Sequence, residues 1–406
     1  MAIKEKHSTH RTVSKMSYEE NKPKAFERSS TVESSYRVYE DGKVGICYNI
    51  GEISDEEGFA RAQADPERAR PYPFTPEAGG ERSRDKSESN MSDRELMDMA
   101  KEYMGYILEK YPQYTFSGDF TSERACSTLT NDLGTNYSNS DACIGLSVRF
   151  KHKDSRDIFD GGIGYNIRKA DDGSIFRFMA DQVLGNFETV AEIPEELIFC
   201  MQYYYLVGFF ASELNAENIA LCTSHFAGKI GEKLFSENFT LEHDASDKEA
   251  WFTRFWDGEG CVLPDDKLML IENGVIKTGY SDKRVAQKYG VPYTKSAGHN
   301  YQDLPSPGGM SLRIRRSDKT INELLAGRPA IIPLNATTSQ MDPKGGMSMV
   351  VNTSLLWDGE RVVGRLPEFR ASMNFFNVFG REYIGVGSDD MPLFNDKAIL
   401  IRMNRL

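Results

Sequence analysis

The sequence predicts an α+β fold, with an antiparallel sheet and helices over about residues 1–190 and a β-rich barrel or sandwich over about 191–406. Residues 26–50 alternate between polar and apolar side chains around a tight turn, which is typical of a β-hairpin. Residues 92–111 carry apolar side chains at helical spacing, and beyond residue 233 short apolar segments alternate with turns. The chain has 406 residues, of which 39% are hydrophobic, so it can form a substantial core.

The first elements are expected before residue 92. The charged segment 1–24 is expected to be a mobile tail, and the hairpin 26–50 turns at the EDGK segment, residues 40–43. Residues 52–70 have a weak apolar face behind candidate capping residues, which predicts a helix. Residues 71–91 combine prolines, adjacent glycines and many charges, which predicts a long surface loop or a mobile strap.

The clearest helix is predicted over residues 92–111. Ser92 and Glu95 have the spacing of a capping box, in which each residue satisfies a backbone N–H of the other, and Pro112 ends the pattern. The apolar side chains recur every three or four residues, at Leu96, Ala100, Tyr103, Met104, Ile107, Leu108 and Tyr111. We expect this face to pack against the N-terminal sheet.

The rest of the chain is expected to be mostly β. Residues 114–168 predict an antiparallel meander with turns at 131–136, 139–141 and 160–164. After a boundary at about 170–192, residues 193–215 predict a helical segment with Pro194 in its first turn. Beyond residue 233 an all-β pattern is expected, with turns at 256–260, 272–275, 306–309 and 357–360.

Composition limits the classes of partner. The formal net charge of −12 and the pI of about 5.2 give no support for binding nucleic acid through its phosphates. The six cysteines form no CxxC pair, which favours a reducing cytoplasm over a disulfide scaffold or a zinc ribbon. The N-terminal segment lacks the apolar run of a secretion signal, and the most apolar stretch, 197–211, is shorter than a bilayer span. We therefore expect a cytoplasmic protein with no nucleic-acid or membrane partner.

The stretch 224–244, SHFAGKIGEKLFSENFTLEHD, has the residue types of a metal site without the arrangement. A catalytic zinc ion needs about three ligands, commonly two histidines of one helix beside a glutamate, and the chain has no His-Glu dipeptide. We expect His225 to be a packed or surface histidine and residues 242–244 to be the polar end of a strand. Residues 228–233 also lack the spacing of a phosphate-binding loop.

A nucleophilic site has equally weak support. The chain has no GxSxG segment. Cys222 lies three residues from His225, and such a pair could activate a thiolate. Core packing is the preferred interpretation of this cysteine, because free cysteines are among the most buried side chains.

An ordered series of segments carries a family resemblance. Residues 228–244, followed by 256–290, resemble the TldD/TldE (PmbA) family, whose members were once called modulators of DNA gyrase. The matching pieces are 34–45, 228–233, 257–260, 271–277, 285–290, 296–301, 305–314, 318–327 and 369–401. The resemblance covers most of residues 26–406 and implies the α+β fold already predicted.

The resemblance also implies which branch the chain represents. TldD chains carry an HExxxH helix and a later cysteine that bind zinc, whereas TldE chains keep the fold without these ligands. Residues 198–227, where the metal helix is expected, contain one histidine, and the last cysteine is Cys261. Glu213 and Glu217 have no histidine partner in the sequence and are expected at the surface. The chain is thus identified as TldE/PmbA-like, with no catalytic, cofactor-binding or metal-binding residues of its own.

The function implied is that of a non-catalytic subunit. Its partner would be a TldD-type zinc peptidase, with the zinc in that partner, acting on unfolded peptides or removing leaders from ribosomally made peptides. Alone, the chain would form a homodimer, and the aromatic segment 369–386 is a candidate interface unless it lies in the core. Three alternatives stay open: a stand-alone peptidase using Cys222, His225 and Glu232, a homodimeric peptide-binding protein, and a regulator of gyrase.

Overall fold

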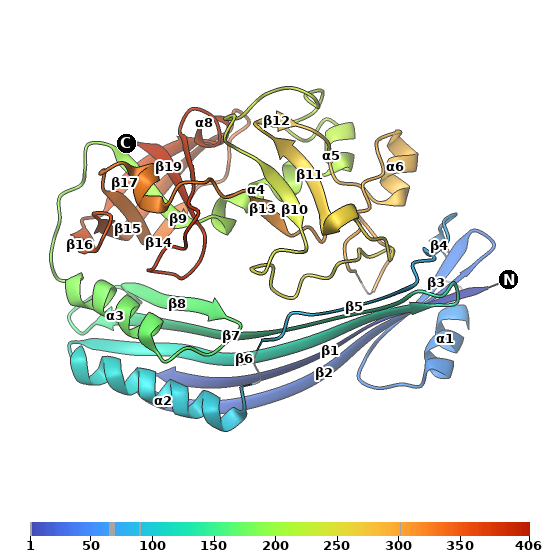
Figure 1. The fold of residues 1–406 in the computed structure, drawn as a ribbon, viewed down its shortest axis with the longest axis horizontal. Helices are drawn as coiled ribbons and strands as arrows, with labels where there is room; N and C mark the ends of the chain where they lie inside the picture. The colour runs from blue at the N-terminus through green and yellow to red at the C-terminus, as the bar shows by residue number, and fades with distance from the viewer. Residues whose placement is uncertain (1, 65–69, 89–90, 301) are drawn as a thin grey trace.

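The computed structural model describes residues 2–64, 70–88, 91–300 and 302–406. A long, curved sheet runs along one side of the molecule, and the C-terminal half lies on its concave face (Figure 1). Its strands are β1 (Ile3–Glu19), β2 (Lys22–Glu40), β3 (Lys43–Ile50), β4 (Arg70–Pro71), β5 (Glu81–Asp85), β6 (Tyr114–Asn131), β7 (Asn136–His152) and β8 (Gly161–Ile167). Their order is β4-β3-β2-β1-β6-β7-β5, with β8 also beside β7, and only β5 pairs in parallel.

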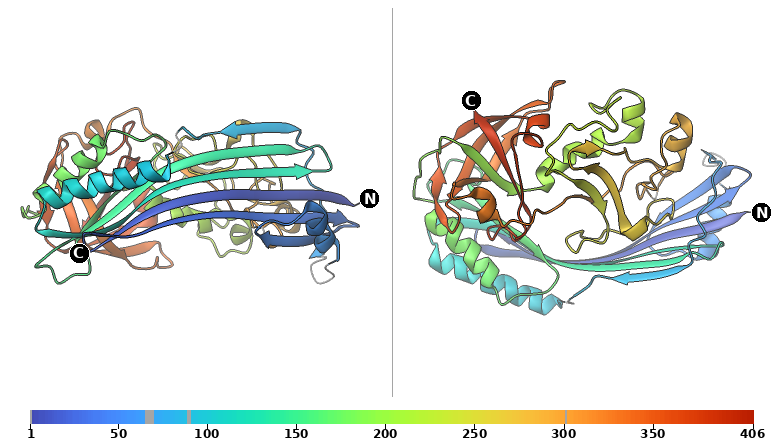
Figure 2. Two further views of the ribbon diagram at one scale, coloured as in Figure 1. Left: turned by 90° about the horizontal axis from the view of Figure 1, so that it is seen from below. Right: turned by 45° about the horizontal axis from the view of Figure 1, so that its top comes forward.

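Two helices cover the opposite face of this sheet, α1 (Asp55–Ala64) at one end and α2 (Asp93–Lys110) at the other, and Figure 2 shows α2 lying across the long strands. The third helix, α3 (Ser174–Asn186), packs beside α2 and β8 and also contacts β16. The capping box of α2 is present as predicted, since Ser92 Oγ accepts the Glu95 N–H and Glu95 Oε2 accepts the Ser92 N–H. Leu96, Tyr103 and Ile107 are buried against the sheet, whereas Leu108 is only partly buried.

The C-terminal half contains two further sheets. Its elements are β9 (Leu197–Gln202), α4 (Tyr204–Glu213), α5 (Ala216–Ala220), β10 (Leu241–Asp244), η1 (Pro264–Asp266), β11 (Lys267–Glu272), β12 (Val275–Ile276), α6 (Lys283–Tyr289), β13 (Leu312–Ile314), α7 (Ile321–Leu325), β14 (Ala330–Thr338), β15 (Gly346–Trp357), β16 (Val362–Leu366), β17 (Phe369–Asn374), α8 (Phe375–Val378), β18 (Tyr383–Val386) and β19 (Ala398–Arg405). Strands β14, β9, β19, β17 and β15 close into a barrel because β14 also pairs with β15. The smaller sheet has the order β12-β11-β10-β13. The predicted α+β class, with an antiparallel N-terminal sheet and a β-rich C-terminal part, is confirmed.

The predicted division into 1–190 and 191–406 stays a prediction. The first sheet uses residues 3–167, and the two other sheets use residues 197–405. One apolar cluster nevertheless joins the halves, because Ile198 and Trp357 pack in the same cluster as Phe176 and Ile107. The site described below lies along this junction.

Several local predictions are confirmed. The hairpin β2–β3 turns where expected, with Asp41 and Gly42 both at positive φ, as a tight two-residue turn requires. The meander β6–β7–β8 is antiparallel, and its first turn lies between Asn131 and Asn136. The β11–β12 turn at 272–275 and the β15–β16 turn at 357–360 are also present.

Other local predictions are wrong. The mobile tail predicted over 1–24 is not observed in the described residues, since β1 lies between β2 and β6. The helix predicted over 52–70 is present but shorter, as α1 over Asp55–Ala64, and residues 65–69 lie outside the described part of the chain. The strap 71–91 contains β5, which pairs with β7, although residues 89–90 of it are not described.

The remaining corrections concern turns and helices. The turns predicted at 139–141 and 160–164 fall largely within β7 and β8, because small polar and glycine residues here lie in paired strands. Residues 193–215 are not one helix, since β9 precedes α4. The region beyond 233 is not all-β either, because it contains α6, α7 and α8. No helix in the described ranges has the length and apolar character needed to cross a membrane.

Candidate functional site

A cavity of about 1100 Å³ lies between the long sheet and the C-terminal half. Strand β8 lines one side of it. The loop 248–254 and the junction of β9 with α4 line others, and residues 390–396, before β19, complete the boundary. A cavity of this size can hold several residues of an extended peptide.

Strand β8 gives the cavity a wall of accessible backbone. Its sequence alternates, so that Ile163 and Tyr165 are buried while Gly162, Gly164 and Asn166 are more accessible. In the described chain β8 pairs with β7 alone, which leaves its other edge without a strand partner. An unpaired edge offers backbone N–H and C=O groups to another extended chain.

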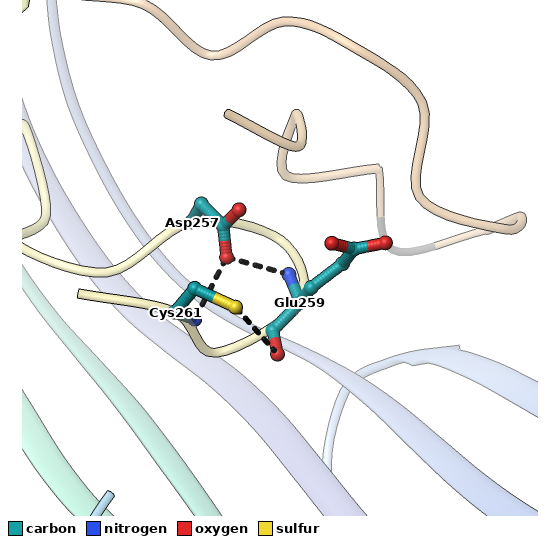
Figure 3. A group of neighbouring side chains, drawn as sticks. All are labelled: Asp257, Glu259 and Cys261. Atoms are coloured by element: carbon teal, nitrogen blue, oxygen red, sulfur yellow. Dashed lines mark hydrogen bonds between the residues drawn. The ribbon is translucent and has the colours of Figure 1, made fainter. Parts of the chain in front are cut away.

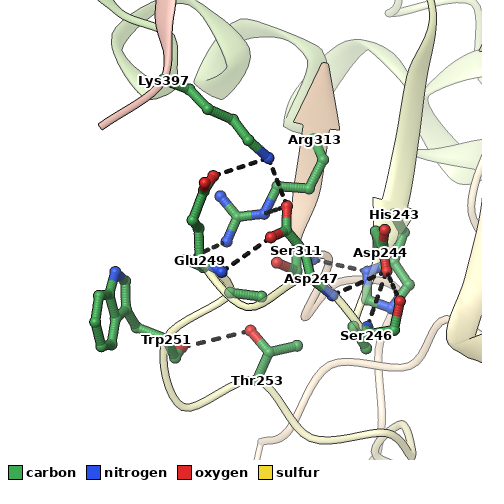
Figure 4. Close-up of polar contacts among 12 residues, drawn as sticks. His243, Asp244, Ser246, Asp247, Glu249, Trp251, Thr253, Ser311, Arg313 and Lys397 are labelled. Atoms are coloured by element: carbon green, nitrogen blue, oxygen red, sulfur yellow. Dashed lines mark hydrogen bonds and ion pairs between the residues drawn. The ribbon is translucent and has the colours of Figure 1, made fainter. Parts of the chain in front are cut away.

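The loop 245–254 forms the opposite wall, and buried ion pairs fix it to the barrel (Figure 4). Lys397 Nζ lies 2.7 Å from Asp247 Oδ2 and 2.8 Å from Glu249 Oε2. The Arg313 guanidinium donates to the Glu249 carbonyl at 2.8 Å, and burial lowers the pKa of Arg313 to about 10. These contacts hold the loop in place even though it has no secondary structure of its own.

The same loop is also fixed to the sheet. The Arg168 guanidinium lies 4.1 Å from the centre of the Trp251 ring and donates to Asp141 Oδ2 at 2.9 Å. Asp141 Oδ2 also accepts the Phe252 N–H at 2.8 Å. Contacts on both sides therefore make loop 245–254 a rigid bridge between the sheet and the barrel.

His243 lies in β10, so the prediction of a polar strand end at 242–244 is confirmed. Its Nδ1 accepts the Ser311 N–H at 2.8 Å, and burial lowers its pKa to about 4. A neutral ring with this hydrogen bond orders the contact between β10 and β13. It gives no indication of a metal ligand.

His225 is held by two acceptors. Its Nδ1 lies 3.1 Å from Glu213 Oε1, and its Nε2 lies 3.1 Å from the Pro343 carbonyl. The prediction that Glu213 lies at the surface without a histidine partner is therefore wrong, since Glu213 is 7% exposed and also accepts the His225 N–H at 2.7 Å. Glu217 is partly buried and accepts from the Tyr289 hydroxyl at 2.9 Å.

The thiol alternative gains no support from these positions. Cys222 is exposed rather than packed in the core, so that expectation is wrong. Glu232 is exposed as well, and the contacts of the His225 ring nitrogens within the described chain are to Glu213 and Pro343. Cys222, His225 and Glu232 are thus not brought together as a catalytic set.

A cluster that the sequence analysis missed lies in the turn after Trp256 (Figure 3). Ligand atoms of Asp257, Glu259 and Cys261 all lie within 4.8 Å of one another, and all three residues are buried. Asp257 Oδ1 accepts the N–H groups of Glu259 and Cys261, at 2.9 and 2.8 Å, and its Oδ2 accepts the Ala297 N–H at 3.0 Å. In the sequence, the three residues occupy every second position, and this spacing is the signal that could have identified the cluster.

Hydrogen bonds from the protein already engage this cluster. Glu259 accepts from the hydroxyls of Tyr72 and Tyr293, at 2.6 and 3.2 Å. Burial raises the pKa of Asp257 to about 6 and, with the Asp257 charge nearby, that of Glu259 to about 7. Carboxyls that bind protons this readily and serve as acceptors for the turn fit a structural role, in which they fix the loop against the sheet.

The zinc chemistry of the resemblance does not fit the residues of this chain. The helices in the region 198–227 are α4 and α5, and neither contains a histidine or a cysteine. The one carboxylate of α4 that is buried, Glu213, is engaged by Ser224 and His225. The region 198–227 supplies a single histidine, His225, and so lacks the paired histidines that the resemblance expects here.

Comparisons with known proteins relate part of the chain to one protein family. Residues 203–398 match the family model described as the PmbA/TldA metallopeptidase C-terminal domain. An uncharacterised protein of Methanocaldococcus jannaschii is 24% identical over 313 residues, which cover 71% of this chain and 68% of the relative.

Solved structures resemble the whole chain. TldE of Thermococcus kodakarensis has a TM-score of 0.82 at 18% identity, covering 99% of this chain and 96% of that one. A candidate modulator of a DNA gyrase from Thermotoga maritima has a TM-score of 0.77 at 17% identity, with the same coverages of 99% and 96%. A similar candidate from Bacteroides thetaiotaomicron has a TM-score of 0.71 at 15% identity, covering 100% and 94%. Residues 203–398 therefore match the C-terminal domain of the PmbA/TldD family, and over its whole length the chain has the fold of TldE.

Proposed function

We propose that this chain is the non-catalytic, TldE-like subunit of a heterodimeric TldD/TldE-type zinc peptidase of the cytoplasm. The zinc would lie in the TldD-type partner, and the substrates would be unfolded peptides or the leaders of ribosomally made peptides. This chain would supply one wall of the chamber in which the peptide is held.

The observation that carries the proposal is the composition of α4. The fold follows TldE over 99% of the chain, yet α4, in the region where the resemblance expects the metal helix, has the sequence YYLVGFFASE. It offers neither the paired histidines nor a nucleophile with a base. A chain with this fold and without these groups in α4 would contribute binding surface to a catalytic partner.

The cavity supports a role in holding peptide. Its lining mixes cations such as Arg168 and Lys248 with carboxylates such as Asp390 and Asp396, so neither charge dominates. The unpaired edge of β8 offers backbone N–H and C=O groups to a second extended chain. Such a lining suits an extended peptide better than a polyanion.

Co-expression with a TldD-type chain tests the assembly. The two chains should co-purify in one complex that contains zinc, and the zinc should be lost when the HExxxH histidines of the partner are replaced. Failure of the two chains to associate at micromolar concentration would contradict the proposal.

A homodimeric peptide-binding protein is the second candidate. It is favoured by one observation, that the 1100 Å³ cavity is formed within a single chain and needs no partner residue. Binding of unfolded peptides by the isolated chain, together with no association with any TldD-type chain, would favour it. The third alternative, a regulator of gyrase, gains no comparable support, because a formal net charge of −12 over 406 residues does not indicate a surface that competes with DNA.

A further inference from the structure

Two tyrosines stand exposed in the cavity where β9 passes into α4. Tyr204 is 49% exposed and Tyr205 is 62% exposed, although both line the same cavity. Their ring centres lie 4.4 Å apart, and the Tyr204 hydroxyl donates to Gln202 Oε1 at 2.9 Å. The hydrogen bond fixes the first ring, so the pair presents a preformed aromatic surface to the cavity.

Asp396 lies next to this surface. Strands β9 and β19 are antiparallel and their pairing ends with Gln202 opposite Ala398, so Tyr204, at the start of α4, and Asp396, just before β19, leave the sheet at the same end. Burial, Tyr205 and the Asp396 charge together raise the pKa of Tyr204, which agrees with this proximity. Asp396 also lines the cavity.

The charges around Asp396 are not balanced. Three neighbouring carboxylates have ion-pair partners: Asp247 and Glu249 contact Lys397, and Asp390 contacts Arg316. Within the described residues no ion pair involves Asp396, whose Oδ1 accepts only the N–H of the next residue, at 2.7 Å. The group Asp247, Glu249, Asp390, Asp396, Arg313, Arg316 and Lys397 therefore holds four carboxylates and three cations.

We infer that Tyr204, Tyr205 and Asp396 form a subsite for a cationic group, an alkylammonium or a guanidinium, of the peptide that enters the cavity. The inference rests on the proposed peptide-holding function and adds a substrate class to it. The carboxylate would pair with the cation, and the aromatic faces would attract it through their quadrupoles. The bound cation would neutralise the fourth negative charge of this group, which has three cations of its own.

The source of the cation can be a lysine or arginine side chain or the peptide's own terminal amine. Fluorescence anisotropy with short unstructured peptides separates these sources. The probes are an N-acetylated, amidated peptide with one central lysine, the same peptide with norleucine at that position, and the norleucine peptide with a free N-terminus. Wild type should bind one of the two cationic peptides about tenfold more tightly than the neutral peptide, as a partly buried ion pair would give.

Two pairs of variants test the residues. Asp396→Asn should abolish the preference for the cationic peptide, whereas Asp41→Asn, in the exposed β2–β3 turn, should retain it. Tyr205→Leu should weaken cationic binding about threefold to fivefold, and Tyr205→Phe should keep it, because the ring rather than the hydroxyl attracts the cation. Tyr205 is exposed enough for both substitutions to leave the fold intact.

Equal affinity of wild type for the cationic and neutral peptides would overturn the subsite, as would a preference that survives in Asp396→Asn. Either result would leave the peptide-holding function standing, since the peptides would still bind. Binding of no peptide at all would contradict the subsite and the peptide-holding role together, and association with a TldD-type partner would then be judged separately.

Discussion

Glu213, at the end of α4, holds His225 through two contacts, one to the ring Nδ1 at 3.1 Å and one to the backbone N–H at 2.7 Å. This pair uses the one histidine of the region 198–227 to fix the loop after α5 to α4. The Pro343 carbonyl on the other ring nitrogen adds the tip of the β14–β15 hairpin to the same contact. The pair has the residue types of a site and acts as a structural link.

The first prediction concerns metal. The purified chain should contain far less than one zinc ion per chain, because a tightly held zinc needs about three ligands and His225 has a single carboxylate beside it. Elemental analysis after dialysis measures this. About one zinc per chain, lost in His225→Ala and kept in the control His152→Ala, would contradict the assignment to the TldE branch.

The second prediction concerns α2. Ile107 is fully buried and Leu108 only partly buried, so Ile107→Ala should lower the free energy of unfolding by about 2–5 kcal/mol and Leu108→Ala by less. Urea unfolding of both variants measures the difference. A larger loss for Leu108→Ala would show that the observed face of α2 is misplaced by one residue.

The third prediction concerns the ion pairs that hold loop 245–254. Lys397→Met leaves the partly buried carboxylates of Asp247 and Glu249 without this cation, so it should cost about 3 kcal/mol of stability. Lys233→Met is the matched control, because Lys233 pairs with Glu237 on the surface and should stay within about 0.5 kcal/mol of wild type. Equal, small effects in both variants would mean that the loop is not fixed by these pairs.

The fourth prediction concerns pH. The pKa of Glu259 is raised from about 4.5 to about 7, chiefly by burial, so between these values the folded chain binds more protons than the unfolded chain. Its contribution to stability is thus largest at acid pH and is lost as the pH rises toward 7. Relative to Glu259→Gln, wild type should lose more than about 1 kcal/mol between these two pH values. Unfolding midpoints that keep a constant difference across that range would contradict the raised pKa.

The sequence predicted correctly those elements whose structure is set by residues close to one another in the chain. The EDGK turn and the pairing of Ser92 with Glu95 need no distant partner, and both are observed. Strand β1 was missed because its burial comes from β2 and β6 on either side rather than from apolar periodicity. The apolar run 197–211 was predicted as a helix because β9 and α4 are both buried, and periodicity cannot separate them.

The sequence could show that a zinc-binding motif is missing, but it could not predict which side chains lie together in the site. The missing HExxxH segment is a property of the sequence, but the contacts of Asp257 with Ala297 and of His225 with Pro343 join residues far apart in the chain. The sequence also could not decide whether the aromatic segment 369–386 lies in the core or at an interface. Phe375 and Phe379 are each 1% exposed, so these two side chains belong to the barrel core and not to an interface.

The most direct test of the central claim is peptide cleavage by the reconstituted pair. An unfolded peptide should be cleaved when this chain is mixed with a TldD-type partner, and cleavage should stop when zinc is chelated. This chain alone should cleave nothing, and its Cys222→Ala variant should support the pair as well as wild type does. Cleavage by the isolated chain that survives chelation and is lost in Cys222→Ala would contradict the account.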